Sequence, residues 1–196
     1  MIAAILLAAG RSSRMGQPKG LLSWEGKPLF LHQLEQFRAS CLDQIIVVLG
    51  HQPESYQPLI DPLGERCTVI YNEQWSQGKS LSILKGLDAL PASTEGILFV
   101  NIDQPLSATI IEPLLASFEN TRFKIHIPIH QGRRGHPILV SAELLAELRS
   151  ISEDTQGLKS IVRAYEKQTA YVEMEDSSIL YNFNTPMDYK CKEGSG

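Results

Sequence analysis

The 196-residue sequence has few cysteines, few aromatic residues and no long apolar run. Its three cysteines are an odd number without a Cys-x-x-Cys spacing, so the sequence indicates neither a disulfide framework nor a zinc site. No segment approaches the roughly 20 apolar residues of a membrane span. The N-terminal apolar run also lacks the charged region that opens a secretory signal. We therefore expect a cytoplasmic protein that does not bind membranes.

The sequence also lacks an excess of positive charge. Its formal net charge is -4, from 18 lysines and arginines against 22 acidic residues. General nucleic-acid binding requires a basic surface, so we expect no nucleic-acid partner. The length and the hydrophobic content of 43% suit one globular domain with its own core. We predict that this domain covers residues 1–189 and that residues 190–196 form a polar tail.

What the sequence does have is an informative beginning. Residues 2–9 are an apolar run that predicts a buried strand, and a loop rich in glycine, serine and cations follows it. Glycine lets backbone N–H groups approach an anion closely, while arginine, lysine and serine side chains donate to phosphate oxygens. The loop has neither a P-loop nor a G-x-G-x-x-G pattern, and a solvated basic turn is the alternative. The candidate phosphate-binding residues are Gly10, Arg11, Ser12, Ser13, Arg14, Gly16 and Lys19.

Hydrophobic periodicity predicts strands that alternate with helices along the chain. Strands are expected at residues 2–9, 44–49, 67–71, 96–102, 124–129, 170–173 and 180–183, with the fifth exposed on one side. Helices are expected to start at Pro28, Ser80, Ser107 or Ala108, Ser141, Gln156 and Pro186. This alternation predicts a single α/β domain with a doubly wound, mostly parallel, Rossmann-like sheet.

The predicted topology places one carboxylate opposite the phosphate loop. In a doubly wound sheet the first and fourth strands are neighbours, and their carboxyl ends flank the binding crevice. The first strand leads to Lys19, and the fourth leads to Asp103. Mg²⁺ is commonly held by one or two carboxylates together with substrate phosphates, which makes Asp103 the candidate metal ligand. The alternative is that Asp103 caps the following helix.

Two further loops carry polar groups beside glycine. The segment 75–80 contains small polar residues at a predicted helix start, where Ser80 would act as the helix cap. As a bare pattern it is typical of a plain helix-entry loop. Arg134, Gly135 and His136 follow the half-exposed strand and suggest a second site for an anion or a heterocycle. A charged hairpin turn is the alternative for this segment.

At this point the sequence resembles a known family. Leu7-Ala8-Ala9-Gly10-x-x-x-Arg14-Met15-Gly16-x-Pro18-Lys19 is similar to the signature of nucleotidyltransferases that activate small phosphorylated metabolites, above all the molybdenum-cofactor cytidylyl- and guanylyltransferases. The resemblance implies that Arg14, Lys19 and Asp103 are catalytic, with Asp103 as the Mg²⁺ ligand. It also implies nucleotide binding by Leu7, Ala8, Ala9, Gly10, Arg11, Ser12, Ser13, Gly16, Gln77, Gly78 and Ser80.

The same resemblance assigns the acceptor side. The segment Arg134-Gly135-His136-Pro137 is similar to one that lines the acceptor site of molybdopterin cytidylyltransferases. Asn182 and Asn184 stand in the family's closing motif, where cytidylyl members often have acidic residues and guanylyl members have Asn-x-Asn-Thr-Pro. A metal-binding role for Asn184 is therefore open. Against the guanylyl reading, Ala9 and the Arg-Gly-His-Pro segment resemble the cytidylyl form.

Three functions follow as hypotheses from the resemblance. The leading one is transfer of CMP from CTP to the phosphate of molybdopterin, with release of pyrophosphate and with a molybdoenzyme as a possible recipient. The second is a guanylyltransferase, or a nucleotidyltransferase for a sugar or polyol phosphate. The third is a non-catalytic module that binds and delivers molybdenum cofactor. The other histidines, His32, His51, His126 and His130, show no partner pattern and are interpreted as structural or surface residues.

Overall fold

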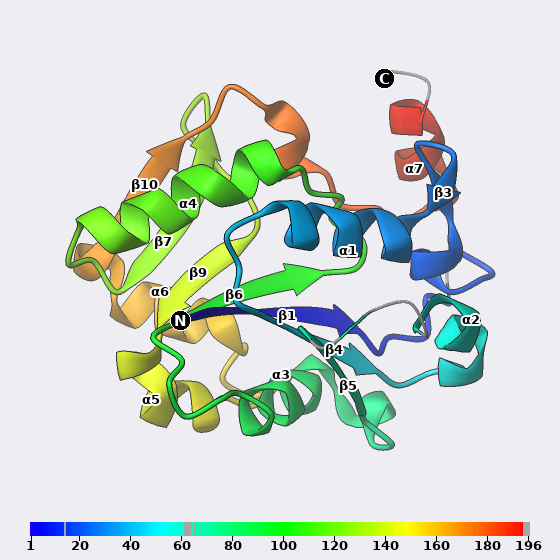
Figure 1. Ribbon diagram of the computed structural model, residues 1–196, viewed down its shortest axis with the longest axis horizontal. Helices are drawn as coiled ribbons and strands as arrows, with labels where there is room; N and C mark the ends of the chain where they lie inside the picture. Colours follow the sequence, from blue (N-terminus) through cyan, green and yellow to red (C-terminus); the bar gives the residue numbers. More distant parts are fainter. Residues whose placement is uncertain (14, 61–63, 65, 194–196) are drawn as a thin grey trace.

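The computed structural model of the protein describes residues 1–13, 15–60, 64 and 66–193. At its centre is a mostly parallel sheet with the strand order β10-β7-β9-β6-β1-β4-β5, and β8 pairs with β7 (Figure 1). The strands of this sheet are β1 (Ile2–Ala8), β4 (Gln44–Leu49), β5 (Cys67–Tyr71), β6 (Gly96–Asn101), β7 (Ile125–His130), β8 (Arg133–Arg134), β9 (Ile138–Ser141) and β10 (Thr169–Glu173). A separate small ribbon pairs β2 (Ser23–Trp24) with β3 (Lys27–Pro28).

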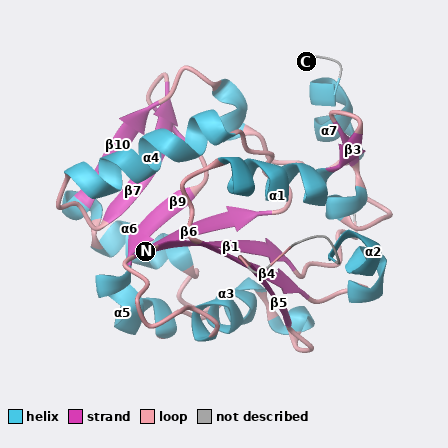
Figure 2. Ribbon diagram, viewed as in Figure 1, coloured by secondary structure: helices cyan, strands magenta, loops and turns pink. Residues whose placement is uncertain are grey.

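Helices cover both faces of the sheet, as Figure 2 shows. The α-helices are α1 (Leu29–Ala39), α2 (Gln57–Ile60), α3 (Lys79–Asp88), α4 (Ala108–Asn120), α5 (Leu145–Arg149), α6 (Leu158–Ala164) and α7 (Pro186–Glu193). α1 and α4 pack on one face, and α3, α5 and α6 pack on the other. None of the described helices is long and apolar enough to span a membrane.

Strand β1 lies at the centre of both cores. Its residues alternate: Ala4 and Leu6 join the core under α1 and α4, while Ile5 and Leu7 join the core under α3, α5 and α6. Successive side chains of a strand point to opposite faces, so a strand with helices on both sides must be apolar throughout. Each fully buried Leu or Ile of this kind stabilises the fold by about 1.5–3 kcal/mol. The apolar run at the start of the sequence therefore has a structural cause.

The predicted neighbourhood of β1 is confirmed. β1 pairs in parallel with β4 on one side and with β6 on the other. The chain thus leaves the sheet in opposite directions on either side of β1, which creates a crevice at the carboxyl ends of β1 and β6. The loops that follow these two strands carry Lys19 and Asp103.

Around β7 one prediction was wrong and one strand was missed. The strand was expected to be exposed on one side, but its residues Ile125 to Pro128 are all buried because α4 packs on it. The sequence analysis also missed β9, which lies antiparallel between β6 and β7. The predicted helix start at Ser141 is confirmed: Ser141 ends β9 and is also the N-cap of a 3₁₀ helix, η5 (Ala142–Leu144), which leads directly into α5, and its hydroxyl accepts a hydrogen bond from the backbone N–H of Glu143.

The strand predicted at residues 180–183 does not form. A 3₁₀ helix, η7 (Ser177–Leu180), starts there because the Asp176 carboxylate accepts the backbone N–H of Ser178, which favours a local turn over a ladder. The chain then crosses the carboxyl ends of the strands, and the N–H of Phe183 donates to the carbonyl of Asp103 at 2.9 Å. α7 begins at Pro186 as predicted, and it continues to Glu193, beyond the predicted start of the polar tail.

Candidate active site

The loop after β1 is a compact turn organised by Ser12. The Ser12 hydroxyl accepts the backbone N–H of Lys19 at 3.2 Å, and its carbonyl accepts the N–H of Met15 at 2.8 Å. Ser12 and Gly16 adopt left-handed conformations, with φ of 55° and 72°, whereas Gly10 does not. The expected glycine freedom is thus used at Gly16, and a serine supplies the other unusual turn. The predicted catalytic residue Arg14 lies outside the described residues.

Lys19 and Asp103 meet across the crevice as predicted. The Lys19 ammonium donates to Oδ2 of Asp103 at 2.7 Å and to Oδ1 of Asn184 at 3.2 Å. Both charged side chains are largely buried, at 12% and 19% exposure, so water screens their attraction only in part. The helix-cap alternative for Asp103 is wrong, because Ser107 occupies the N-cap of α4.

Packing behind Lys19 holds this pair in place. Lys19 starts a 3₁₀ helix, η1 (Lys19–Leu21), whose Gly20 lies against the buried ring of Tyr56. A Cβ added at Gly20 would lie 2.6 Å from Cε1 of Tyr56, so only glycine permits this approach. On the other side, the backbone of Asp103 is fixed by its bond to Phe183. The two partners are therefore positioned by separate parts of the chain.

A cavity of about 420 Å³ opens below this loop, and we call it the loop cavity. The predicted residues that line it are Leu7, Ala9, Gly10, Arg11, Ser12, Lys19, Gly78, Asp103 and Asn182. Ala8 is buried in the core instead. The predicted nucleotide-binding residues Ser13, Gly16 and Gln77 are not in its lining. The loop cavity thus gathers most of the predicted phosphate site in one place.

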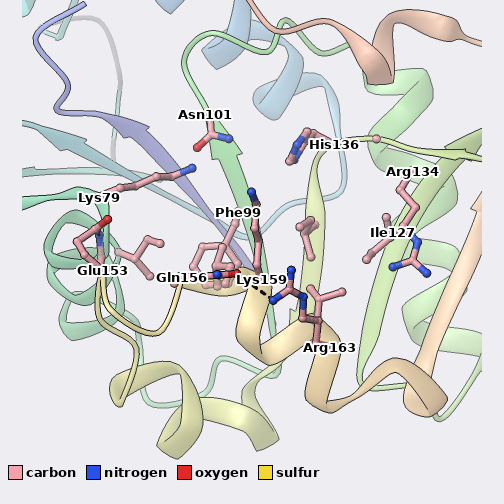
Figure 3. A pocket seen from close by; sticks show the side chains of 17 residues that line it. Lys79, Phe99, Asn101, Ile127, Arg134, His136, Glu153, Gln156, Lys159 and Arg163 are labelled. Atoms are coloured by element: carbon pink, nitrogen blue, oxygen red, sulfur yellow. Dashed lines mark hydrogen bonds between the residues drawn. The ribbon is translucent and has the colours of Figure 1, made fainter.

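A second cavity of about 740 Å³ lies beside α6, and we call it the α6 cavity (Figure 3). Arg134, Gly135 and His136 line it, as does Ser80, which the sequence analysis had assigned to the nucleotide. Its apolar wall is built from Ile83, Phe99, Ile127, Ile138, Leu158 and Val162. Lys79 and Asn101 line both cavities, so the two spaces adjoin.

Asn182 and Asn184 lie apart from the other predicted acceptor residues. Asn184 bonds to Lys19, and Asn182 lines the loop cavity. The structure therefore groups both asparagines with the Lys19–Asp103 pair and not with Arg134 and His136. This grouping follows from η7 and the crossing segment, which replace the strand predicted there.

Arg134 lies at the edge of the α6 cavity in a network of its own. Its guanidinium donates to Oε1 and Oε2 of Glu166 at 2.6 and 3.3 Å and stacks over the ring of Tyr171 at 4.7 Å. The Tyr171 hydroxyl donates to the same carboxylate at 2.6 Å. These bonds lower the pKa of Glu166, first through Tyr171 and then through Arg134. The Arg134 charge is therefore already compensated.

The Arg134 segment has features of both predicted alternatives, the charged hairpin turn and the second binding site. β8 pairs antiparallel with β7 through a turn, which is the charged hairpin, while Gly135 and His136 continue into the α6 cavity. Gly135 is needed because an added Cβ would lie 2.6 Å from the carbonyl oxygen of Ile179. Burial, together with repulsion from Lys79, lowers the pKa of His136 to about 4. His136 is therefore neutral at neutral pH.

The entry to α3 differs from the prediction. The helix starts at Lys79 with Gly78 at the N-cap, so Ser80 is not the cap. The backbone N–H of Ser80, which lies in the first turn of the helix, donates to Oε1 of Glu153 at 2.6 Å. This bond lowers the pKa of Glu153. Glu153 comes from the loop before α6, far along the chain, so no local sequence pattern indicates this contact.

Several residues of the site were missed in the sequence. Lys79, Glu153, Lys159 and Arg163 line the α6 cavity, and Asn101 lines both cavities. One signal was available, since Lys159 and Arg163 stand four residues apart and share a face of the predicted helix.

The other histidines are structural, as expected, in two cases. His32 is buried, and its Nε2 lies 2.9 Å from the carbonyl of Leu106. His126 is buried between Ser117 and the carbonyl of Phe123. The described residues contain no cluster of three or more His, Cys, Asp or Glu side chains that would form a metal site by themselves.

Comparison with curated proteins finds relatives over nearly the whole chain. The sequence is 29% identical to the molybdenum cofactor cytidylyltransferase of Escherichia coli K12, covering 96% of this chain and 93% of that protein. It is 28% identical to the nicotine blue oxidoreductase of Paenarthrobacter nicotinovorans, over 94% and 92%. It is also 29% identical to the molybdenum cofactor guanylyltransferase of Xanthomonas euvesicatoria, over 93% and 89%. The relatives thus carry mixed activities.

Solved structures share the fold. Rv0371c of Mycobacterium tuberculosis matches with a TM-score of 0.85 and 22% identity over 98% of this chain and 97% of that one. The complex of Rv0371c with manganese matches with a TM-score of 0.76 and 20% identity, over 100% of this chain and 99% of that one. A nucleotidyl transferase from Methanothermobacter matches with a TM-score of 0.81 and 25% identity, over 100% of this chain and 97% of that one.

The family model of the MobA-like NTP transferase domain matches residues 4–169. With its Rossmann-like sheet, the chain belongs to the MobA-like NTP transferase family.

Proposed function

We propose that the protein transfers CMP from CTP to the phosphate of molybdopterin, releasing pyrophosphate. The observation that carries this proposal is the Lys19–Asp103 pair, which lies in the loop cavity, and this cavity adjoins the α6 cavity at Lys79 and Asn101. A site that joins two phosphorylated substrates needs two adjoining spaces and a means of neutralising charge between them. The named relatives include molybdenum cofactor cytidylyl- and guanylyltransferases, which fits this arrangement.

The loop cavity suits the triphosphate of the nucleotide. Arg11, Ser12 and Lys19 line it together with Gly10. Guanidinium, hydroxyl and backbone N–H groups are the donors that bind polyphosphate. In this proposal Arg14, from the same loop, adds a further charge. Lys19 exchanges Asp103 for a phosphate oxygen when the substrate enters.

Asp103 is the proposed ligand of Mg²⁺. Its carboxylate is the acidic group of the described loop cavity, and Asn184 offers a weaker amide oxygen on the same ammonium. One carboxylate fits Mg²⁺, since this ion keeps several waters and takes its other ligands from substrate phosphates. When bound, the ion would neutralise phosphate charge and orient the triphosphate. A related fold has been solved with manganese, which is consistent with a divalent ion at such a site.

The α6 cavity is the proposed acceptor site. Its apolar wall, which includes Phe99 and Ile127, suits a flat heterocycle, while neutral His136 can bond to ring polar groups. An oxygen of the acceptor phosphate forms a bond to the α-phosphorus of CTP. The bond from that phosphorus to its bridging oxygen breaks, and pyrophosphate leaves with the electron pair. The attacking oxygen is already ionised, so the reaction needs no general base.

Ala9 supports the choice of CTP over GTP. It is buried, its carbonyl accepts the N–H of His51 at 3.0 Å, and it packs against Gly50. A methyl group at this position narrows the loop cavity, which favours the smaller base. The guanylyl alternative is supported by Asn182 and Asn184, whose pattern is the guanylyl form and which the fold places beside Lys19.

The test is pyrophosphate release by the purified protein with Mg²⁺ and either CTP or GTP, with anaerobically prepared molybdenum cofactor as acceptor. Release with CTP and cofactor is the expected result. Pyrophosphate release with GTP and not with CTP would show that the protein is a guanylyltransferase. Release only with a sugar or polyol phosphate would show that the acceptor is not molybdopterin. Binding of cofactor without any release would favour a delivery module. If the proposal holds, the product is made in the cytoplasm for a molybdoenzyme partner.

A further inference from the structure

The α6 cavity carries an excess of positive charge. Its lining includes four cationic side chains, Lys79, Arg134, Lys159 and Arg163, and a single carboxylate, Glu153. Arg134 is paired with Glu166, and Arg163 donates to Oε1 of Gln156 at 2.9 Å. Two cations therefore remain to be explained.

Within the described part of the chain, the ammonium groups of Lys79 and Lys159 make no hydrogen bond and no ion pair. Both nearby carboxylates form bonds to other groups. Glu153 is held by the N–H of Ser80, and Asp103 is held by Lys19 at 2.7 Å. Lys79 and Lys159 thus face the cavity without a hydrogen-bonded or ion-paired partner among the described residues.

The two lysines come from different elements and point into the same space. Lys79 starts α3 and Lys159 lies in the first turn of α6, yet Figure 3 shows both side chains directed toward His136 and Asn101. The charges of the two lysines also interact. Loss of hydration at the cavity wall lowers the pKa of Lys79. The negative charges of Asp103 and Glu153 raise this pKa, and the positive charges of Lys159 and Lys19 lower it further. Both side chains remain solvent-accessible through the open cavity.

Like charges that converge without an ion-pair partner repel one another, and a bound anion removes this cost. We propose that Lys79 and Lys159 form a clamp for the dianionic phosphate monoester of the acceptor, with the Asn101 amide and neutral His136 as its hydrogen-bonding neighbours. This inference rests on the proposed function. Because Lys79 lines both cavities, the clamp holds the acceptor phosphate at their junction and turns one oxygen toward the nucleotide.

The sharpest test compares three variants: Lys159→Met, Lys159→Arg and the control Lys85→Gln, which changes an exposed lysine of α3 outside both cavities. A hydrogen bond to a charged group contributes enough that Lys159→Met should raise the KM for the acceptor roughly 10- to 100-fold. The Kd for the nucleotide should stay unchanged. Lys159→Arg should restore most of the acceptor affinity, because it keeps the charge, and Lys85→Gln should match the wild type. An unchanged acceptor KM in active Lys159→Met would overturn the clamp.

A second measurement separates this inference from the proposed function. Inorganic phosphate is titrated into the wild type, Lys159→Met and Lys85→Gln, followed by NMR of lysine labelled with ¹³C at Cε. The clamp predicts that the Lys79 and Lys159 signals shift together in the wild type, and that phosphate binds about tenfold more weakly to Lys159→Met. Equal phosphate binding by all three proteins would contradict it. A wild type that shows this binding yet releases no pyrophosphate with any acceptor would refute the proposed function and keep the anion site.

Discussion

The two cavities adjoin at Lys79 and Asn101 but are organised in opposite ways. In the loop cavity the central cation, Lys19, already has partners in Asp103 and Asn184. In the α6 cavity Lys79 and Lys159 lack such partners among the described residues. A group that is paired internally is positioned before substrate arrives, whereas unpaired cations attract an anion. We therefore expect changes in the first cavity to alter turnover and changes in the second to alter binding.

The largest expected effect comes from Lys19→Met. This change removes a positioned charge at the reacting phosphates, so kcat should fall by about 100-fold or more. The thermal transition should fall only modestly, because Asp103 keeps access to solvent at 19% exposure. Steady-state pyrophosphate release and a melting curve check both parts. Activity equal to that of the wild type would show that the pair has no catalytic role.

A second contrast concerns glycine in each cavity. Gly135→Ala should cost about 1–3 kcal/mol in the free energy of unfolding, since the new Cβ would lie 2.6 Å from the carbonyl oxygen of Ile179. Gly10→Ala is the matched change in the loop cavity, where a Cβ meets nothing within 4 Å. Denaturant unfolding of both variants checks this difference. Similar losses in both would mean that the close approach at Gly135 is relieved by small shifts.

Glu153→Gln changes the charge of the α6 cavity and should have a smaller effect than the substitutions above. The amide can still accept the N–H of Ser80, but the cavity loses its carboxylate. We expect the KM for the acceptor to fall about two- to threefold, and stability to fall by about 0.5 kcal/mol as a charge near the start of α3 is lost. Kinetics at low ionic strength measure the first effect. A raised KM would indicate that Glu153 itself binds the acceptor.

At neutral pH the smallest effect is expected from the titration of His136, which changes stability only in acid. Its pKa is about 4 in the folded protein against 6.5 for the free side chain, so it stays uncharged at neutral pH. Below pH 6.5 the unfolded state binds the proton more readily, and stability falls as the pH drops toward 4. The melting temperature of the wild type should therefore decline more steeply over this range than that of His136→Asn. Parallel declines would contradict the assigned pKa.

The sequence predicts the parts of this molecule that depend on local patterns. The apolar run of β1, the loop after it and the neighbouring positions of β1 and β6 follow from periodicity and parallel topology, and so does the meeting of Lys19 with Asp103. These features need only the order of strands along the chain.

Features that depend on long-range packing escaped prediction. β9 is a short apolar segment whose antiparallel place between β6 and β7 is set by its neighbours. Glu153 and Lys159 approach α3 only because α5 and α6 fold back over that face. The α6 cavity is therefore a product of tertiary structure, although the resemblance of Arg134, Gly135 and His136 to a known acceptor segment pointed to its edge.

The most direct measurement is mass spectrometry of the acceptor after incubation with CTP, Mg²⁺ and either the wild type or Lys19→Met. The account predicts that the acceptor gains a CMP group with the wild type and that this product nearly vanishes with the variant. Equal yields of the CMP adduct from both proteins would contradict the central role of the Lys19–Asp103 pair. Bound acceptor that never gains a nucleotide from the wild type would contradict nucleotidyl transfer itself.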